Sequence, residues 1–233
     1  MVNLQEKIAS LCSSATFEEG EYLLVNVADK EWYALAKKLK EELGFDYLVS
    51  VTGVDWNETL GCMYYLTNTE TNEKISVKVA TADREKPMLH SVTDFWKVAL
   101  LQEREVFDFY GIVFIGHPDM RRLFMRTDWV GYPLRKDYDA NPELNPLRLD
   151  AEENEDDSFV VTEDENGKLT KTDYKIFGEN DYVVNFGPQH PSTHGVMRLR
   201  CAIDGETINK VVPVCGDIRR GLERLCGSKT YPQ

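Results

Sequence analysis

Two histidines, His190 and His194, are the residues whose type and spacing could most directly do chemistry. They are four residues apart, which is the spacing of a helical zinc-binding pair, but Pro191 lies between them and disfavours a helix. No nearby Asp, Glu or Cys completes a metal site. Two interpretations stay open: a structural turn whose histidines bond to the backbone, or a loop that presents an imidazole to a polar ligand.

A second candidate is the carboxylate of Glu103, which opens the stretch 103–138. Glu103 falls on the apolar stripe of a predicted helix, four residues after Ala99 and seven after Trp96. Because a buried carboxylate is costly without a partner, we expect it either to pair with an arginine or to lie half-solvated at the rim of the core. The candidate partners are Arg104, Arg121 and Arg122. Acid–base catalysis is disfavoured because no second reactive group accompanies Glu103.

Other catalytic and metal-binding patterns find no support in the sequence. The run from Asp119 to Arg122 contains two arginines, but no glycine-rich loop leads from it into a helix, which disfavours a phosphate site. The five cysteines are scattered and form no C-x-x-C motif, so neither a zinc site nor a self-contained iron–sulfur site is predicted. We expect reduced thiols, no catalytic residue and no metal ligand.

Composition narrows the possible partners. The 233 residues carry a formal net charge of −13, which makes the chain a poor general ligand for nucleic acid or anionic lipid. No run of about 18 apolar residues occurs, so a transmembrane helix is excluded by sequence. The N-terminal residues lack the apolar core of a secretory signal, and we therefore expect a cytoplasmic location.

The elements that must position the candidates indicate an α+β fold with a mostly antiparallel sheet and two main helices. One helix is predicted from Asp29, as N-cap, to a stop at Gly44, and the other over 92–109. A short helix is also predicted over 2–12. Short connections favour antiparallel pairing of the predicted strands. These strands cover 22–27, 45–51, 62–66, 75–79 and the residues that follow Tyr110.

A proline-punctuated segment, 118–149, follows this first domain of residues 1–117. It shows little helical or strand periodicity and is rich in aromatic and basic side chains, the residue types that anchor interfaces. It could be a loop over its own domain. At about thirty residues such a loop would be unusually long, which favours an extended arm that docks on another surface.

Residues 150–180 are predicted to be a flexible acidic linker, because 150–165 contain nine acidic residues and no basic one. The segment 181–233 then predicts three strands, over 182–186, 196–203 and 207–214, and a helix over 218–226. So few short elements cannot bury much core alone, so we expect this segment to be the beginning of a larger, β-rich domain.

The stretch 103–138 resembles the signature of the C-type subunit of respiratory complex I, the proton-pumping NADH–quinone oxidoreductase. The matching pieces are ERE at 103–105, Asp108, Gly111, GHPDMRR at 116–122, DW at 128–129 and GYPLRKDY at 131–138. The last segment is similar to the start of the D-type subunit, through NFGPQHPSTHGVMRL at 185–199, DGE at 204–206, RGLERL at 220–225 and TYPQ at 230–233. The chain is identified by this resemblance as a fused C–D polypeptide that is truncated in its D-type part. It departs from the family at Arg126, Val214 and Arg219.

The resemblance implies a hydrophilic scaffold subunit of the peripheral arm, with no cofactor of its own. The complex uses NADH, FMN, iron–sulfur clusters and quinone, and couples electron transfer to proton translocation. The implied partners are other peripheral-arm subunits, chiefly the rest of the D-type subunit and the one that holds the terminal iron–sulfur cluster. The implied location is the cytoplasmic face of the bacterial inner membrane. The alternative is the C-like domain of a membrane-associated nickel–iron hydrogenase or formate hydrogenlyase.

The same resemblance assigns roles to individual residues. His194, with His190 near it, corresponds to a histidine in the turn that bonds the quinone headgroup. An imidazole there can donate a hydrogen bond to a quinone carbonyl. Arg220 corresponds to an arginine near the terminal iron–sulfur cluster. The remaining residues are expected to be structural or interfacial: Glu103, Arg104, Glu105, His117, Arg121, Arg122, Trp129, Arg135 and Lys136.

Overall fold

The structure is a computed structural model that describes residues 2–127, 129–138, 156–189, 195–216, 222–228 and 230. Some predictions concern residues outside these ranges: His190, His194, Arg220, the segment 139–149 and the segment 150–155. The described helices are α1 (Val2–Leu11), α2 (Asp29–Glu41), α3 (Ala99–Tyr110) and α4 (Leu222–Ser228). None of these helices is long and apolar enough to cross a membrane.

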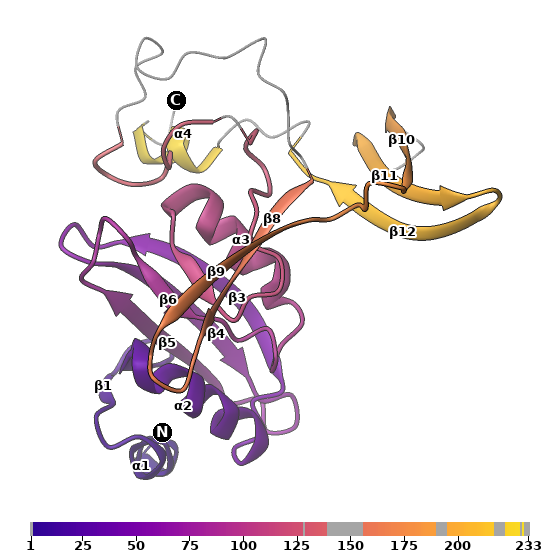
Figure 1. Ribbon diagram of the computed structural model, residues 1–233. Coiled ribbons are helices and arrows are strands. Elements are labelled where there is room, and N and C mark those ends of the chain that lie inside the picture. The colour runs from indigo at the N-terminus through magenta and orange to yellow at the C-terminus, as the bar shows by residue number, and fades with distance from the viewer. Residues whose placement is uncertain are drawn as a thin grey trace.

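A five-stranded sheet forms the centre of the first domain (Figure 1). Its strands, in spatial order, are β1 (Thr16–Glu18), β2 (Leu23–Ala28), β5 (Lys74–Thr81), β4 (Leu60–Thr67) and β3 (Tyr47–Asp55). Only the β2–β5 pair is parallel within this sheet. The fold is therefore α+β with mostly antiparallel pairing, as predicted.

The two longest helices, α2 and α3, cover the same face of this sheet. The Tyr64 ring of β4 lies 4.6 Å from that of Trp32 in α2. Gly53 of β3 is directly opposite Cys62, which shares a face with Tyr64. A side chain at Gly53 would meet the Tyr110 ring of α3 at 2.4 Å, so α3 packs closely on this strand. The main hydrophobic core fills the space between these layers.

Helix α2 follows its sequence pattern. The four apolar residues at helical spacing, Trp32, Leu35, Ala36 and Leu39, are all buried. The prediction of Asp29 as N-cap is wrong. Asp29 is the first helical residue, and its carboxylate instead accepts the backbone N–H of His90 at 2.8 Å. The helix thereby bonds to strand β6 (Met88–His90).

Strand β3 and helix α3 differ from their predicted forms. In β3, Tyr47 and Val49 are exposed while Leu48 is buried, because a register shift between Leu48 and Ser50 reverses the alternation. Helix α3 begins at Ala99 rather than residue 92, since 93–98 form turns. It ends at Gly111, whose φ of 72° is left-handed and favours glycine. The residues after it form β7 (Val113–Ile115), parallel to β6.

The predicted flexible linker is wrong for its described part. Residues 157–175 form an antiparallel hairpin of β8 (Asp157–Glu163) and β9 (Leu169–Lys175). Phe159 exchanges two backbone hydrogen bonds with Met120, and its ring lies 5.7 Å from that of Phe107. The hairpin forms because the acidic segment contains a short run of strand-forming residues, SFVV. The prediction of a linker considered only the number of acidic residues.

A second, three-stranded sheet projects from the side of the first domain (Figure 1). It has the order β10 (Tyr182–Gln189), β11 (Met197–Asp204) and β12 (Thr207–Val214), close to the three predicted strands. Its buried apolar cluster is small and consists of Ile176, Phe177, Ala202 and Val212. Helix α4, described from Leu222 to Ser228, overlaps the helix predicted over 218–226 and extends two residues beyond it.

Candidate functional site

The candidate site is built on two charged residues of α3, Arg104 and Asp108, which lie one helical turn apart. Asp108 is fully buried. Its Oδ2 accepts three consecutive backbone N–H groups, those of Leu123, Phe124 and Met125, at 3.1, 2.7 and 2.8 Å. One side chain thus satisfies a whole turn of backbone that has no strand or helix partner.

Arg122 completes this arrangement. Its Nη1 donates to Asp108 Oδ1 at 2.9 Å, a charge-assisted hydrogen bond with a buried acceptor. Its Nη2 donates to the carbonyls of Trp129 and Gly131, both at 3.0 Å. The guanidinium also lies over the Tyr132 ring at 5.3 Å. Arg122 therefore fixes the following segment onto α3.

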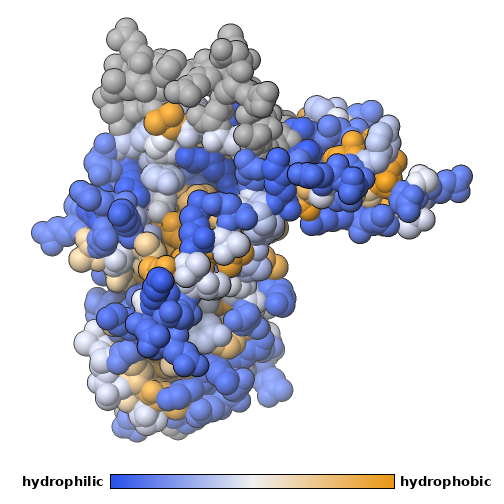
Figure 2. Space-filling model, in the orientation of Figure 1, coloured by the Kyte–Doolittle hydropathy of each residue, from blue (hydrophilic) through white to orange (hydrophobic). Residues whose placement is uncertain are grey.

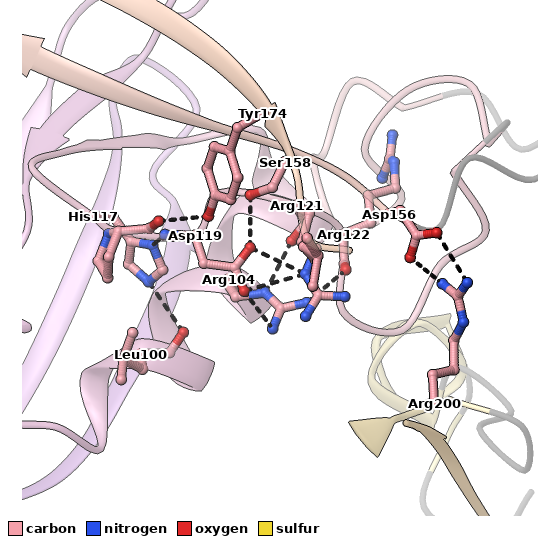
Figure 3. A network of polar contacts seen from close by, with 12 residues as sticks. Leu100, Arg104, His117, Asp119, Arg121, Arg122, Asp156, Ser158, Tyr174 and Arg200 are labelled. Atoms are coloured by element: carbon pink, nitrogen blue, oxygen red, sulfur yellow. Dashed lines mark hydrogen bonds and ion pairs between the residues drawn. The ribbon is translucent and has the colours of Figure 1, made fainter. Parts of the chain in front are cut away.

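A second cluster gathers around the carboxylate of Asp119 (Figure 3). It accepts hydrogen bonds from Arg121 Nε at 3.0 Å and from Ser158 Oγ of β8 at 2.7 Å, with Arg104 Nη1 at 3.6 Å. Burial raises the pKa of Asp119, but Ser158 and the two arginines outweigh it, so the pKa lies below its usual value. Asp119 thus joins α3, its own loop and the hairpin.

Arg104 lies at the centre of both clusters and is itself buried. Its Nε and Nη2 donate to the carbonyls of Arg121 and Arg122 at 3.2 and 3.0 Å. Burial and the neighbouring Arg121 lower the pKa of Arg104 to about 10. The side chain remains charged at neutral pH, and its role is to bond the loop backbone.

His117 is fully buried and held in one tautomer (Figure 3). Its Nδ1 accepts the backbone N–H of Asp119 at 3.0 Å, so the proton is on Nε2, which donates to Leu100 O at 3.1 Å. Burial lowers the pKa of His117 to about 4. A neutral imidazole with both nitrogens bonded to backbone has a structural role rather than one in proton transfer.

Glu103 is fully buried and bonds to no arginine that the structure describes, so both predicted alternatives, an arginine partner and a half-solvated position at the rim, are wrong. Its carboxyl group accepts hydrogen bonds from Ser91 Oγ at 2.7 Å and from the backbone N–H of Val92 at 2.9 Å. Burial raises its pKa to about 8, although both hydrogen bonds oppose this shift. The arginines bond instead within the Asp108 and Asp119 clusters. Glu105, two residues on, is half-buried on the same helix.

The described part of the predicted docking arm folds over its own domain. Arg135 Nε donates to Tyr110 O at 2.6 Å, and its Nη1 donates to Arg84 O at 2.9 Å. The backbone N–H of Lys136 donates to Asp55 Oδ2 at 3.0 Å, while its side chain is exposed. The segment 118–138 is therefore a long loop bonded to α3 and β3, which corrects the extended-arm prediction for these residues. A loop of this length is stable because the carboxylates of Asp55 and Asp108 accept hydrogen bonds from its backbone N–H groups.

Several residues of the site were missed by sequence reasoning. Asp55 is bonded to a residue 81 positions away, and Ser158 to one 39 positions away, so no local pattern reveals them. Tyr174, from β9, donates to Pro118 O at 2.7 Å in the same way. Asp108 did leave a signal, because its spacing of four from Arg104 places both on one side of a helix.

The loop also meets the projecting sheet. A cavity of about 350 Å³ separates them, and its charged lining residues are all arginines. These are Arg104, Arg121, Arg122, Arg126, Arg198 and Arg200. Arg200 of β11 pairs with Asp156, and a Cβ placed on Gly216 would lie 2.6 Å from Phe124 O. The same loop thus contacts both parts of the chain. No group of three metal-ligating side chains occurs among the residues that the structure describes.

Known proteins are similar in sequence to this chain over most of its length. It is 53% identical over 197 residues to an NADH-quinone oxidoreductase C/D subunit of Phocaeicola vulgatus, covering 84% of this chain and 38% of the relative. It is 49% identical over 207 residues to the C/D subunit of Bacteroides thetaiotaomicron, covering 84% and 39%. The chain thus spans about two fifths of the length of these relatives.

A solved structure also contains a chain of similar fold. A chain in the structure of the membrane-bound sulfane sulfur reductase, an archaeal respiratory membrane complex, superimposes with a TM-score of 0.54 at 25% identity, over 61% of this chain and 88% of that chain. The family model described as "respiratory-chain NADH dehydrogenase, 30 Kd subunit" matches residues 25–143, a range that includes α2, α3, most of the central sheet and the loop bonded by Asp108 and Arg122. The chain therefore belongs to the family of the 30 kDa subunit of respiratory-chain NADH dehydrogenase.

Proposed function

We propose that this chain is a hydrophilic scaffold subunit in the peripheral arm of an NADH–quinone oxidoreductase. The proposal rests on the bonds that the family's signature residues form in this structure. Asp108, Arg122 and His117 are all committed to bonds within the chain. Residues that hold a loop in place supply a shaped surface, which is what a scaffold requires.

The wider activity follows from the same proposal. The complex would pass electrons from NADH through FMN and iron–sulfur clusters to quinone, coupled to proton translocation, at the cytoplasmic face of the inner membrane. Its partners would be other peripheral-arm subunits, chiefly the rest of the D-type subunit and the one that holds the terminal iron–sulfur cluster. The naming of the relatives as NADH-quinone oxidoreductase C/D subunits supports this assignment.

Within the proposal, residues 181–233 are the beginning of a domain like the D-type subunit. His194, with His190, would bond the quinone headgroup, and Arg220 would lie near the terminal cluster. These roles are supported by the match of the sequence to the family's motifs at these positions. The close agreement of β10, β11 and β12 with three predicted strands also supports a separate, β-rich unit here.

The alternative is the C-like domain of a nickel–iron hydrogenase. The archaeal sulfane sulfur reductase contains a chain of similar fold, so this fold is not confined to one respiratory complex. The curated relatives of higher identity are NADH–quinone oxidoreductase subunits, and this favours the first proposal.

The test is to delete the gene and measure NADH oxidation by quinone in isolated membranes. The proposal predicts that this activity is lost, that the remaining peripheral-arm subunits fail to co-purify, and that a plasmid copy restores both. Unchanged NADH–quinone activity in the deletion strain would reject the proposal. Loss of hydrogen-dependent electron transfer instead would favour the hydrogenase alternative.

A further inference from the structure

The strand pairing of the projecting sheet gathers apolar residues on one of its faces. Residues directly opposite each other in antiparallel strands share a face, and so do alternate residues along a strand. The resulting apolar face consists of three cross-strand rows: Tyr182, Ile203 and Ile208; Val184, Cys201 and Val211; Phe186, Leu199 and Pro213. No charged or amide side chain interrupts these nine positions, and the one amide on this face, Gln189, lies beyond them, opposite Met197.

The opposite face of the sheet has a different character. There, Val183, Ala202 and Val212 pack with Ile176 and Phe177 into the small cluster of this part of the chain. The same face also carries charged residues, and one of them, Arg200, pairs with Asp156. The sheet therefore already buries one face within this chain, and that face is the less apolar of the two.

Most of the apolar face is open, although Cys201 in its central row is only 2% exposed. The exposed fractions of Tyr182, Ile208, Phe186 and Val211 are 70%, 55%, 49% and 49%. Figure 2 shows hydrophobic residues on the projecting part of the molecule, among hydrophilic neighbours. Burying such side chains away from water is favourable, and a contiguous exposed apolar surface of this kind marks an interaction site.

We propose that the apolar face is the packing surface for the remainder of a domain like the D-type subunit, that is, for the sequence that the C/D relatives have beyond the part matched by this chain. This inference rests on the proposed function. The chain spans 38% and 39% of two such relatives, so most of their polypeptide is available to cover it. The buried apolar cluster beside this sheet has only four residues, of which Ala202 and Val212 belong to the sheet itself, so the sheet needs further packing to be stable.

The chemistry of the face argues for this occupant. Its nine positions carry no lysine or arginine and the chain has a net charge of −13, which disfavours an anionic lipid surface. A second copy of this chain could also offer an apolar partner, and the experiment must distinguish it. A polypeptide that continues the same domain would bury all three rows in one core, as the inner faces of two packed sheets are buried in a β-sandwich.

The test uses this whole chain, co-expressed with the unmatched part of the Phocaeicola vulgatus relative as a separate polypeptide, so that the two can fold together. We expect a one-to-one complex and slower amide hydrogen exchange in β10, β11 and β12 than in the chain alone. Phe186→Asn and Ile208→Asn should each reduce the recovered complex at least about tenfold, since each places a polar group in an apolar contact. Asn185→Ser is the matched control, because Asn185 neighbours Phe186 on the opposite face, and it should leave recovery unchanged.

Three results would overturn the inference. One is that the two polypeptides do not associate although the chain keeps its helical and sheet circular dichroism. Another is that Phe186→Asn associates as well as the unaltered chain. The third is a dimer of this chain that Phe186→Asn abolishes and the added polypeptide does not disrupt, which would make a second copy the occupant. The proposed function is judged separately by restoration of membrane NADH–quinone activity. If the unaltered chain and the Phe186→Asn variant restore it equally, the function stands and this inference fails.

Discussion

Asp108 Oδ2 lies 2.7 Å from the backbone nitrogen of Phe124, at the centre of three consecutive N–H groups that this one carboxylate accepts. Its other oxygen binds Arg122. Because Asp108 is fully buried and the Arg122 side chain is only 13% exposed, loss of either group would leave the other as a poorly solvated, unpaired charge. The shape of the loop after His117 therefore depends on a residue of the preceding helix.

Asp108→Asn should destabilise the chain by about 3 kcal/mol, because Arg122 would lose its buried counter-charge and an amide N–H₂ would face a donor. Urea denaturation followed by tryptophan fluorescence measures the change. Asp137→Asn is the control, since the Asp137 side chain is 61% exposed and should contribute less than about 1 kcal/mol. Equal stability of the two variants would contradict the role given to Asp108.

Arg122→Ala should likewise destabilise the first domain, by about 3 kcal/mol, rather than only weaken association with partner subunits. The structural reason is that Arg122 bonds Asp108 and the carbonyls of Trp129 and Gly131. Lys136→Ala is the matched control, because its side chain is exposed and its backbone N–H is retained. If Arg122→Ala melts with the unaltered chain but fails to co-purify with partners, Arg122 is an interface residue after all.

Glu103 predicts that stability depends on pH between about 4.5 and 8. Its pKa is raised from 4.5 to about 8 in the folded chain, so the folded state binds more protons than the unfolded state between these values. Stability should therefore fall as pH rises from about 4.5 to 8, by at most about 1.4 kcal/mol for each pH unit, and level off above. Glu103→Gln, which keeps an acceptor for Ser91, should flatten this dependence. A Gln variant with the same pH profile would show that Glu103 is already ionised at neutral pH.

His90 predicts a second, distinguishable pH effect. Its Nδ1 lies 3.0 Å from Asp29 Oδ2 and its Nε2 lies 3.0 Å from Glu163 Oε2, so it ties α2 to the hairpin. The hydrogen bond to Asp29 and the Glu163 contact raise its pKa from 6.5 to about 9, although burial opposes them. The stabilisation is complete below about 6.5 and is lost as pH rises through about 9.

His90→Gln should remove that second effect and increase amide exchange in β8 near Glu163. Because the Glu163 side chain is 37% exposed, we expect a loss of only about 1 kcal/mol at pH 7. The window above pH 8, where the Glu103 effect has levelled off, separates the two residues. Unchanged exchange in β8 at every pH would show that the hairpin does not depend on His90.

The sequence predicted those parts of the molecule whose pattern is local. The apolar spacing of Trp32, Leu35 and Leu39 identified α2, and strand-forming runs identified β4, β5 and the projecting sheet. The site depends instead on partners far apart in sequence, such as Asp55 with Lys136 and Ser158 with Asp119. Polar groups at such separations carry no periodicity, so only the folded chain brings them together.

The hairpin and the loop were misjudged for a related reason. Charge composition indicated a flexible segment around residue 160, yet Phe159 and Val161 bond to the first domain through their backbones, and Ser158 bonds to it through its side chain. Loop length indicated an external docking arm, but the carboxylates of Asp55 and Asp108 supplied its backbone with partners inside the domain. Charge composition and loop length describe a whole segment, so they do not show what a single residue at a particular position contributes.

The central claim is that the signature residues shape a scaffold and take no part in the reaction. The most direct measurement is NADH–quinone turnover per assembled complex in membranes whose only copy of this chain carries Asp108→Asn. We predict that the amount of assembled complex falls while turnover per assembled complex stays at the unaltered value. A complex that assembles at the unaltered level but turns over at least about tenfold more slowly would contradict the claim.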